Sequence, residues 1–230
     1  MTENYSVLMS VYIKEKPEYL KEAITSILNQ TVKTNDFVIV CDGPLTEGLN
    51  KVIADFVTTY SGLFNVYRLE HNMGLAKALN NGILQCKNEI IVRMDSDDVS
   101  MPDRVEKQMK AMKEKNADIV GSNIIEFVGD ISNTGNMRVV PENNEEIIMF
   151  AKNRSPFNHP SVMYKMGEMK AEQLAETTLN PDTRRLLPVT FGSVAEAATQ
   201  SIMNLLMAAN ESNGRRLWME AYGNRVEADV

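Results

Sequence analysis

The sequence has few of the residues and patterns that mark several protein classes. Among its 230 residues there are two cysteines, so no disulfide framework can be built. No apolar stretch approaches the roughly 20 residues that a membrane span needs, and we recognise no signal peptide at the start. Basic residues number 24 against 31 acidic ones, and the formal net charge is −7. Because DNA-binding surfaces usually carry a basic excess, we expect no strong nucleic-acid binding.

The overall composition is typical of a folded domain. Apolar residues make up 43% and charged residues 24%, so disorder along the whole chain is excluded. Cys41 and Cys86 both lie in apolar runs, and we expect them to be buried free thiols. The length suits one domain of moderate size, or one truncated domain with an additional piece.

Residue usage changes near position 165. Residues 1–165 contain 14 Ile and 13 Lys, whereas residues 166–230 contain one of each. The second region is instead rich in Ala and Arg, whose codons are G/C-rich where those of Ile and Lys are A/T-rich. Two coding origins joined at this point would produce the change; the alternative is chance together with a helix-rich C-terminus, which favours Ala. We therefore expect two regions, 1–165 and 166–230.

Strand-like and helix-like segments alternate over the first 121 residues. Short apolar runs stopped by turn residues predict strands at 5–12, 37–41, 65–69, 89–94 and 118–121. Apolar residues at helical spacing predict helices that start at Pro17, near Leu49, after an Asn72 cap and at Pro102. The inner face of the third helix is predicted to hold Leu75, Leu79, Ile83 and Cys86. The alternation predicts an α/β fold with an open, mostly parallel sheet and helices on both faces.

Polar residues stand where three of the predicted strands end. In an open α/β sheet the ligand crevice lies outside the carboxyl ends of the strands, so residues far apart in sequence meet there. The residues at these strand ends are Ser10, Tyr12, Asp42, Asp95, Asp97 and Asp98. The pattern predicts a single crevice but does not identify its ligand.

The segment Asp95-Ser96-Asp97 has the spacing of a metal site. Alternate residues of an extended chain point the same way, so the two carboxylates can converge on one cation. Carboxylates that leave coordination positions open suit Mg²⁺ or Mn²⁺, which substrate phosphates and water then complete. The alternative is a solvated acidic turn that precedes the helix at Pro102, with Asp103 in its first turn.

Other polar residues have open alternatives. Asp42 accepts a hydrogen bond from a base N–H, or forms an Asx turn with the glycine and proline that follow it. Tyr12 stacks on that base, or packs in the core. The Asn72-x-Gly74 sequence with Lys77 binds an anion at a helix start, or is only a capped helix. His159 lies in an irregular loop and is either functional or part of a structural hydrogen bond.

The first 165 residues resemble family 2 glycosyltransferases, which use nucleotide sugars and have a GT-A fold. The resemblance is strongest to enzymes that build bacterial surface polysaccharides. The residues that carry it lie, in order and at the family's spacing, at 6–12, 28–31, 38–44, 72–76, 79–82, 93–98, 101–104 and 158–163.

The resemblance implies a role for each of the matching site residues. Ser10 and Tyr12 would line the nucleobase pocket, and Asp42 would bind the uracil-like edge. Asp95 would face ribose and metal, Asp97 would ligate the metal on the diphosphate, and Asp98 and Arg104 would support that loop. His159 would lie near the donor diphosphate or the acceptor. The implied chemistry is inverting transfer from a nucleotide-diphosphate sugar, UDP-sugar favoured, to a saccharide or lipid-linked acceptor. The implied location is the cytoplasm, peripheral at the inner face of the membrane.

The chain departs from this family after Tyr164-Lys165. Family members continue with a Gly-Gly-Tyr segment and then a Glu-Asp pair, whose Asp is the general base that deprotonates the acceptor. No such segment follows here. The family base is therefore missing, and we expect glycosyl transfer to be reduced or absent, with His159 the remaining candidate for a catalytic role.

The last 65 residues resemble a different family, the C-terminal end of the ATPase subunit of bacterial type II topoisomerases. The ending Arg215-Arg216-Leu-Trp218 is closer to the ATPase subunit of topoisomerase IV than to that of gyrase. Ala, Leu and Met content predicts helices at about 193–210 and 214–222. The metal carboxylates of that family lie upstream of the matched part and are absent. Two rival hypotheses therefore remain, a DNA-associated fragment and a non-functional chimera.

Overall fold

The computed structural model describes residues 4–129, 131–151 and 155–166. These residues belong to one compact unit, which lies within Met1–Ala171. The helices expected at 193–210 and 214–222 lie outside the described residues. None of the helices that the structure does describe has the length and apolar character of a membrane span.

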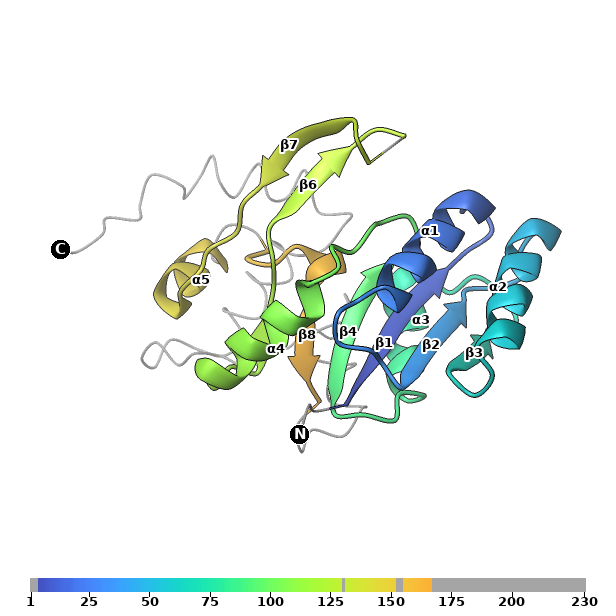
Figure 1. Cartoon of the computed structure of the whole chain (residues 1–230), viewed down its shortest axis with the longest axis horizontal. Coiled ribbons are helices and arrows are strands. Elements are labelled where there is room, and N and C mark those ends of the chain that lie inside the picture. The colour runs from blue at the N-terminus through green and yellow to red at the C-terminus, as the bar shows by residue number, and fades with distance from the viewer. Residues whose placement is uncertain (1–3, 130, 152–154, 167–230) are drawn as a thin grey trace, which may run out of the picture. The chain divides into compact units, whose positions relative to one another are not determined.

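The described residues form a six-stranded sheet and a separate two-stranded hairpin (Figure 1). The sheet strands are β1 (Tyr5–Val11), β2 (Asp36–Cys41), β3 (Phe64–Arg68), β4 (Ile90–Asp95), β5 (Ile119–Val120) and β8 (Met163–Lys165). Their order is β3-β2-β1-β4-β8-β5. Strands β1 to β4 are mutually parallel, and β8 runs antiparallel to both β4 and β5. The prediction of an open, mostly parallel sheet is thus confirmed.

Helices follow the strands in the expected alternation. They are α1 (Pro17–Leu28), α2 (Glu47–Thr59), α3 (Leu75–Ile83), α4 (Arg104–Glu114) and α5 (Asn144–Ala151), with a 3₁₀ turn, η1 (His159–Ser161). The hairpin strands are β6 (Ile124–Phe127) and β7 (Thr134–Arg138). Elements β6, β7, α5 and β8 were not predicted. Every residue of β7 is exposed, so its sequence has no apolar alternation from which a strand could be read.

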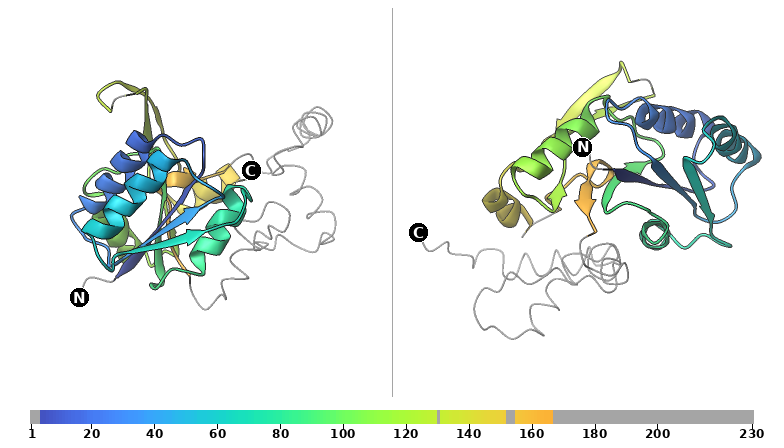
Figure 2. Two further views of the ribbon diagram at one scale, coloured as in Figure 1. Left: turned by 90° about the vertical axis from the view of Figure 1, so that its right-hand side faces the viewer. Right: turned by 60° about the horizontal axis from the view of Figure 1, so that its bottom comes forward.

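The sheet is covered on both faces. One face of β1, with Tyr5, Val7 and Met9, packs in the core that includes the buried residues of α1, α2 and α4. The opposite face, with Leu8, meets α3, where a side chain larger than hydrogen at Gly82 would collide with Leu8. Figure 2 shows α3 on the other side of the sheet from α1 and α2. Cys41 is a buried free thiol, as expected, whereas the free thiol Cys86 is only half-buried.

The prediction for the start of the third helix was wrong. Helix α3 begins at Leu75, after a Gly74 with φ of 85°, and Asn72 is not its cap. The Asn72 amide instead donates to the carboxylate of Asp42. Leu75 is exposed rather than inward-facing, and the helix ends before Cys86. The periodicity correctly identified a helix but could not reveal a partner 30 positions away.

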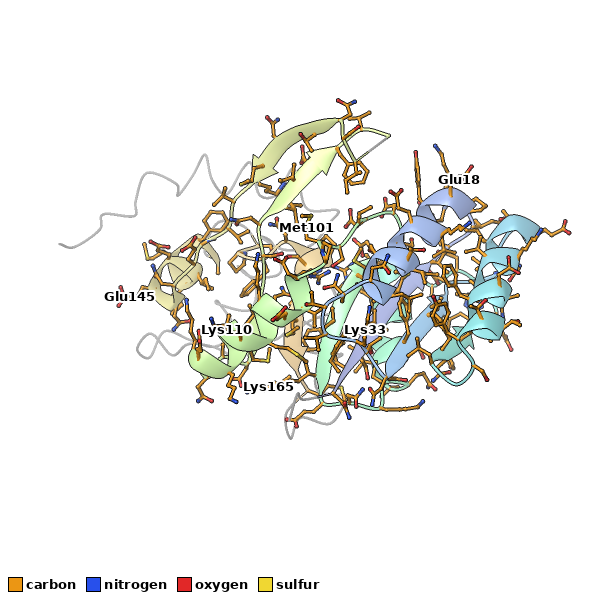
Figure 3. The ribbon with its side chains drawn as sticks, viewed as in Figure 1. Glu18, Lys33, Met101, Lys110, Glu145 and Lys165 are labelled. Atoms are coloured by element: carbon orange, nitrogen blue, oxygen red, sulfur yellow. The ribbon has the colours of Figure 1, made fainter. Side chains whose placement is uncertain are left out.

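The side chain of Gln30 fastens α1 to the segment that leads into α4. Gln30 is fully buried, and its Nε2 donates to Ser26 O at 3.1 Å, Ser100 Oγ at 3.1 Å and Met101 O at 2.8 Å. Its Oε1 accepts from the backbone N–H of Val105 at 3.0 Å. Met101 is labelled in Figure 3, where this segment lies beside α1. The polar atoms of Gln30 therefore fix the position of the loop that follows β4.

We expect Gln30→Ala to lower the free energy of unfolding by about 3 kcal/mol, because it leaves buried polar groups without partners. Urea denaturation followed by circular dichroism measures this change. The matched control is Gln85→Ala, since Gln85 is half-buried and its hydrogen bonds run through its backbone. Equal transition midpoints for the two variants would contradict the role given to Gln30.

Candidate functional site

The carboxyl ends of β1, β2 and β4 meet at one edge of the sheet. Ser10 pairs in register with Asp95 of β4 on one side and with Val40 of β2 on the other. The backbone N–H of Asp42, directly after β2, donates to Val11 O at 2.8 Å. The structure therefore places the predicted strand-end residues Ser10, Asp42 and Asp95 on adjacent strands at this edge.

Asp42 organises the loop before α3. Its Oδ1 accepts from the Met73 N–H at 2.7 Å, and its Oδ2 accepts from the Gly74 N–H and from Asn72 Nδ2, both at 3.0 Å. An Asx turn, the alternative for Asp42, would bond to the backbone of the residues that directly follow it, whereas these bonds reach residues 72–74. A carboxylate can accept about four hydrogen bonds, so one direction remains for a further donor. The amides of Met73 and Gly74 are thus engaged by Asp42 rather than open to an anion, and helix α3 itself has no side-chain cap among the described residues.

Two arginines, Arg93 and Arg104, lie near the side chain of Asp95. Arg93 Nη2 donates to Asp95 Oδ1 at 2.8 Å, and Arg93 is buried while Asp95 is half-buried. In the described part of the chain, Nε and Nη1 of Arg93 are buried and have no hydrogen-bond partner. Arg104, from the start of α4, donates through Nη2 to Arg93 O at 2.8 Å. Burial lowers the pKa of Arg104 to about 10, so the guanidinium remains charged at neutral pH.

The acidic segment concentrates negative charge. Burial, then the neighbouring Asp95 and Asp97, raise the pKa of Asp98 to about 6. Burial also raises the pKa of Asp95, although Arg93 opposes this. Asp97 is exposed. Such crowding favours a cation at this edge of the sheet, since a positive charge would relieve the repulsion.

A metal ion here would have few protein ligands. Within residues 4–129, 131–151 and 155–166, no three side chains of His, Cys, Asp or Glu gather as a metal site. Asp95 has one oxygen engaged by Arg93, and Asp97 is open to solvent. This donor set fits an ion such as Mg²⁺, which commonly takes one or two carboxylates and completes its shell with phosphate oxygens and water.

Tyr12 and His159 lie in different surroundings. Tyr12 is the first residue after β1 and is 43% exposed, so core packing is wrong for it and its ring is open to a ligand. His159 begins η1, which packs beside β4. It also borders a cavity of about 490 Å³ that is lined by parts of β6, β7 and α5, by residues 139 and 140, and by residues 155 and 157–160. The described residues that line this cavity include none of the acidic residues 95–98.

Sequence reasoning missed several residues that hold this site. Arg93 is a charged residue inside an otherwise apolar run, and that position was a usable signal. Gln30 continues the inner face of α1 and could have been noticed as a polar residue at an apolar position. Glu15 and Ser96 are hydrogen-bonded to each other across 81 positions, and no local pattern marks them.

Two solved structures have a fold similar to that of this chain. S. aureus TarS 1–349 in complex with UDP aligns with a TM-score of 0.56 and 18% identity, covering 96% of this chain and 71% of that chain. The mannosyltransferase PcManGT from Pyrobaculum calidifontis, in complex with GDP-Man and Mn²⁺, aligns with a TM-score of 0.52 and 14% identity, covering 79% and 53%. At these identities the likeness shows the fold, which is GT-A-like.

Curated relatives fall into two groups that match different parts of the chain. The Escherichia coli UDP-Gal:alpha-D-GlcNAc-diphosphoundecaprenol beta-1,3-galactosyltransferase is 41% identical over 170 residues, 73% of this chain and 60% of that protein. The amylovoran biosynthesis glycosyltransferase AmsE of Erwinia amylovora is 38% identical, covering 72% and 61%. The B subunit of DNA topoisomerase 4 of Salmonella typhimurium is 40% identical over 65 residues, 28% of this chain and 10% of that protein. The chain thus spans about three fifths of the glycosyltransferases that it matches.

Two family models divide the chain in the same way. The model of the DNA gyrase B subunit, carboxyl terminus, matches residues 164–220, which confirms the resemblance of the last region and is consistent with a chimeric chain. The other model, glycosyl transferase family 2, matches residues 6–171 and therefore well over half of the protein. The chain belongs to glycosyl transferase family 2.

Proposed function

We propose that the first 165 residues are the donor-binding region of a nucleotide-sugar-dependent, inverting glycosyltransferase of surface polysaccharide biosynthesis. The observation that carries this proposal is the register that brings Ser10, Asp42 and Asp95 to the carboxyl ends of adjacent strands. The relatives are named as enzymes of this kind, and one name specifies UDP-Gal and a diphosphoundecaprenol-linked acceptor. A protein with such an acceptor would work in the cytoplasm, at the inner face of the membrane.

The base end and the phosphate end of the donor would be held by different strands. The exposed ring of Tyr12 can stack on a base, and Ser10 lies at the same strand end. Asp42 retains one acceptor direction for a base N–H, and the loop at Asn72 keeps its carboxylate in place. A UDP-sugar is favoured because the acceptor character of Asp42 suits the N–H of uracil.

Mg²⁺ or Mn²⁺ would be held by Asp95 and Asp97. When bound, the cation would neutralise the charge that develops on the leaving diphosphate. Arg104 would support the loop, since it donates to the backbone carbonyl of Arg93 in β4, and its charge would attract the nearby Asp98. The N–H groups of Arg93 that have no partner within the described residues are further donors beside Asp95. These residues would hold the diphosphate in line while an acceptor hydroxyl attacks the anomeric carbon.

We expect Asp97→Ala to weaken the metal-dependent affinity for UDP well over tenfold, because diphosphate then faces carboxylates that no cation neutralises. Calorimetric titration with UDP, in Mn²⁺ and in chelator, measures the effect. The control is Asp55→Ala, which removes an exposed carboxylate from α2 without touching this edge of the sheet. Equal affinity of the parent chain with and without chelator would refute the metal site.

The segment that supplies the family's general base would be missing from this chain. Tyr164 and Lys165 are compatible with both families, and the two family models overlap at 164–171, so we place the join there. A sugar hydroxyl is a poor nucleophile until a group accepts its proton, and a positioned base contributes about 10² to 10⁴ in rate. His159 is the remaining candidate for that base, since η1, which it begins, packs beside β4.

We expect UDP-sugars to be bound but transferred slowly or not at all. Nucleotide release from a panel of UDP-sugars, with and without a lipid-linked acceptor, measures this. Slow hydrolysis to free sugar is the expected residual reaction, since water needs less positioning than a sugar hydroxyl. Acceptor-stimulated turnover at about 1 s⁻¹ or faster would show that another group supplies the base.

A DNA-associated role is the second candidate, because residues 164–220 match a topoisomerase-type family. The matched part covers only 10% of the Salmonella relative. The net charge of −7 opposes binding to DNA. A gel shift with duplex DNA at several salt concentrations distinguishes the two functions: a salt-dependent shift together with no binding of UDP would favour the DNA-associated role.

A further inference from the structure

The loop between β1 and α1 contains a turn that ends at Glu15. The backbone N–H of Glu15 donates to Tyr12 O at 3.1 Å, which forms a turn from Tyr12 to Glu15. One carboxylate oxygen of Glu15, Oε1, accepts from the Lys16 N–H at 2.8 Å. The residue therefore fixes the backbone on both sides of itself, and Tyr12 lies at the other end of the turn.

The second carboxylate oxygen of Glu15 reaches the acidic segment. Ser96 Oγ donates to Glu15 Oε2 at 2.7 Å, and Ser96 is buried. Ser96 is the residue between Asp95 and Asp97 in the chain. A hydrogen bond to a carboxylate is roughly twice as strong as one between neutral groups. Through this bond the loop that carries Tyr12 is tied to the segment that carries the two aspartates.

The negative charge of Glu15 is unfavourable beside the acidic segment. Burial is the main cause of the raised pKa of Asp95, and Glu15 lies close enough to raise that pKa further. Glu15 thus adds to the negative charge at this edge of the sheet. A neutral acceptor would still bond to Ser96, more weakly, but without that repulsion. The hydrogen bond and the charge of Glu15 are therefore separable by substitution.

We propose that Glu15 is a positioning residue that, through Ser96, holds Tyr12 at a fixed distance from Asp95 and Asp97. The proposal rests on the donor-binding function given above, in which Tyr12 contacts the base and the aspartates face the diphosphate. A nucleoside diphosphate spans both groups, so its affinity depends on their spacing. Uridine, which lacks the phosphates, does not need that spacing.

Two substitutions of Glu15 separate the bond from the charge. Glu15→Ala removes both and is expected to weaken UDP binding in Mn²⁺ about tenfold, the worth of one charge-assisted hydrogen bond. Glu15→Gln removes the charge and the bond from the Lys16 N–H but keeps an oxygen that accepts from Ser96, so UDP should bind several-fold more tightly than to Glu15→Ala. Glu18→Ala removes an exposed carboxylate at the start of α1 (Figure 3) and is the control. A purely electrostatic role for Glu15 predicts instead that Glu15→Ala binds UDP more tightly than the parent does, and that result would overturn the proposal.

A double-mutant cycle tests that Glu15 acts through Ser96. Ser96→Ala should weaken UDP binding as much as Glu15→Ala, and the double variant should be within about twofold of either single variant. Uridine affinity should change little in all three. Additive losses, or an equal loss for uridine, would show that the residues act independently or only maintain the fold.

Hydrogen exchange on the full chain without ligand keeps the test independent of donor binding. Ser96→Ala should speed exchange of the Glu15 amide, which is bonded to Tyr12 O, and of the Lys16 amide, which is bonded to the Glu15 carboxylate, and leave the hairpin β6–β7 unchanged. Unchanged exchange at these two amides contradicts the tie between the loop and the acidic segment. If the parent chain fails to bind UDP but the exchange changes as expected, the donor-binding function is wrong and the tie stands as a structural feature.

Discussion

The position of the acidic segment after β4 depends on hydrogen bonds of the two residues that flank α1, Glu15 and Gln30. Beyond the C-terminal end of the helix, Gln30 bonds to Ser100, Met101 and Val105. Ahead of its N-terminal end, Glu15 accepts from Ser96. The carboxylates of this loop repel one another. The hydrogen bonds of Gln30 and Glu15 nevertheless hold the loop at both ends. The residues at the two ends of α1 therefore hold residues 96–105 in position.

The same edge of the sheet carries charges that the described residues leave incompletely paired. Burial and neighbouring carboxylates together raise the pKa values of Asp95 and Asp98. Within the part of the chain that the structure describes, Arg93 keeps two buried donors without partners. A fold selected for stability alone would not retain incompletely paired charge of both signs in one place. A cation and an anionic ligand bound together would satisfy both, and a nucleotide diphosphate with its metal is such a pair.

The sequence was sufficient for the features that local patterns encode. Apolar runs located β1, β2 and β4, and the strand-end rule gathered Ser10, Asp42 and Asp95 without any coordinates. It failed where a contact joins distant residues. Asn72 looked like a helix cap but serves Asp42, and Glu15 bonds to a residue 81 positions away. The hairpin β6–β7 was missed because β7 is exposed throughout and neither strand has a clear alternation of apolar and polar residues.

Residues 6–171 match the glycosyltransferase family and contain the candidate donor site, and residues 164–220 match another family. We propose that this second match stands where the segment with the base would otherwise follow. Mn²⁺ is paramagnetic, so nuclear magnetic resonance of the full chain with Mn²⁺ and UDP tests the candidate donor site most directly. The account predicts that amide signals of residues 10–12 and 93–98 broaden only when both are present, while those of β6–β7 persist. Broadening that needs no UDP, or that is confined to residues 166–230, would contradict it.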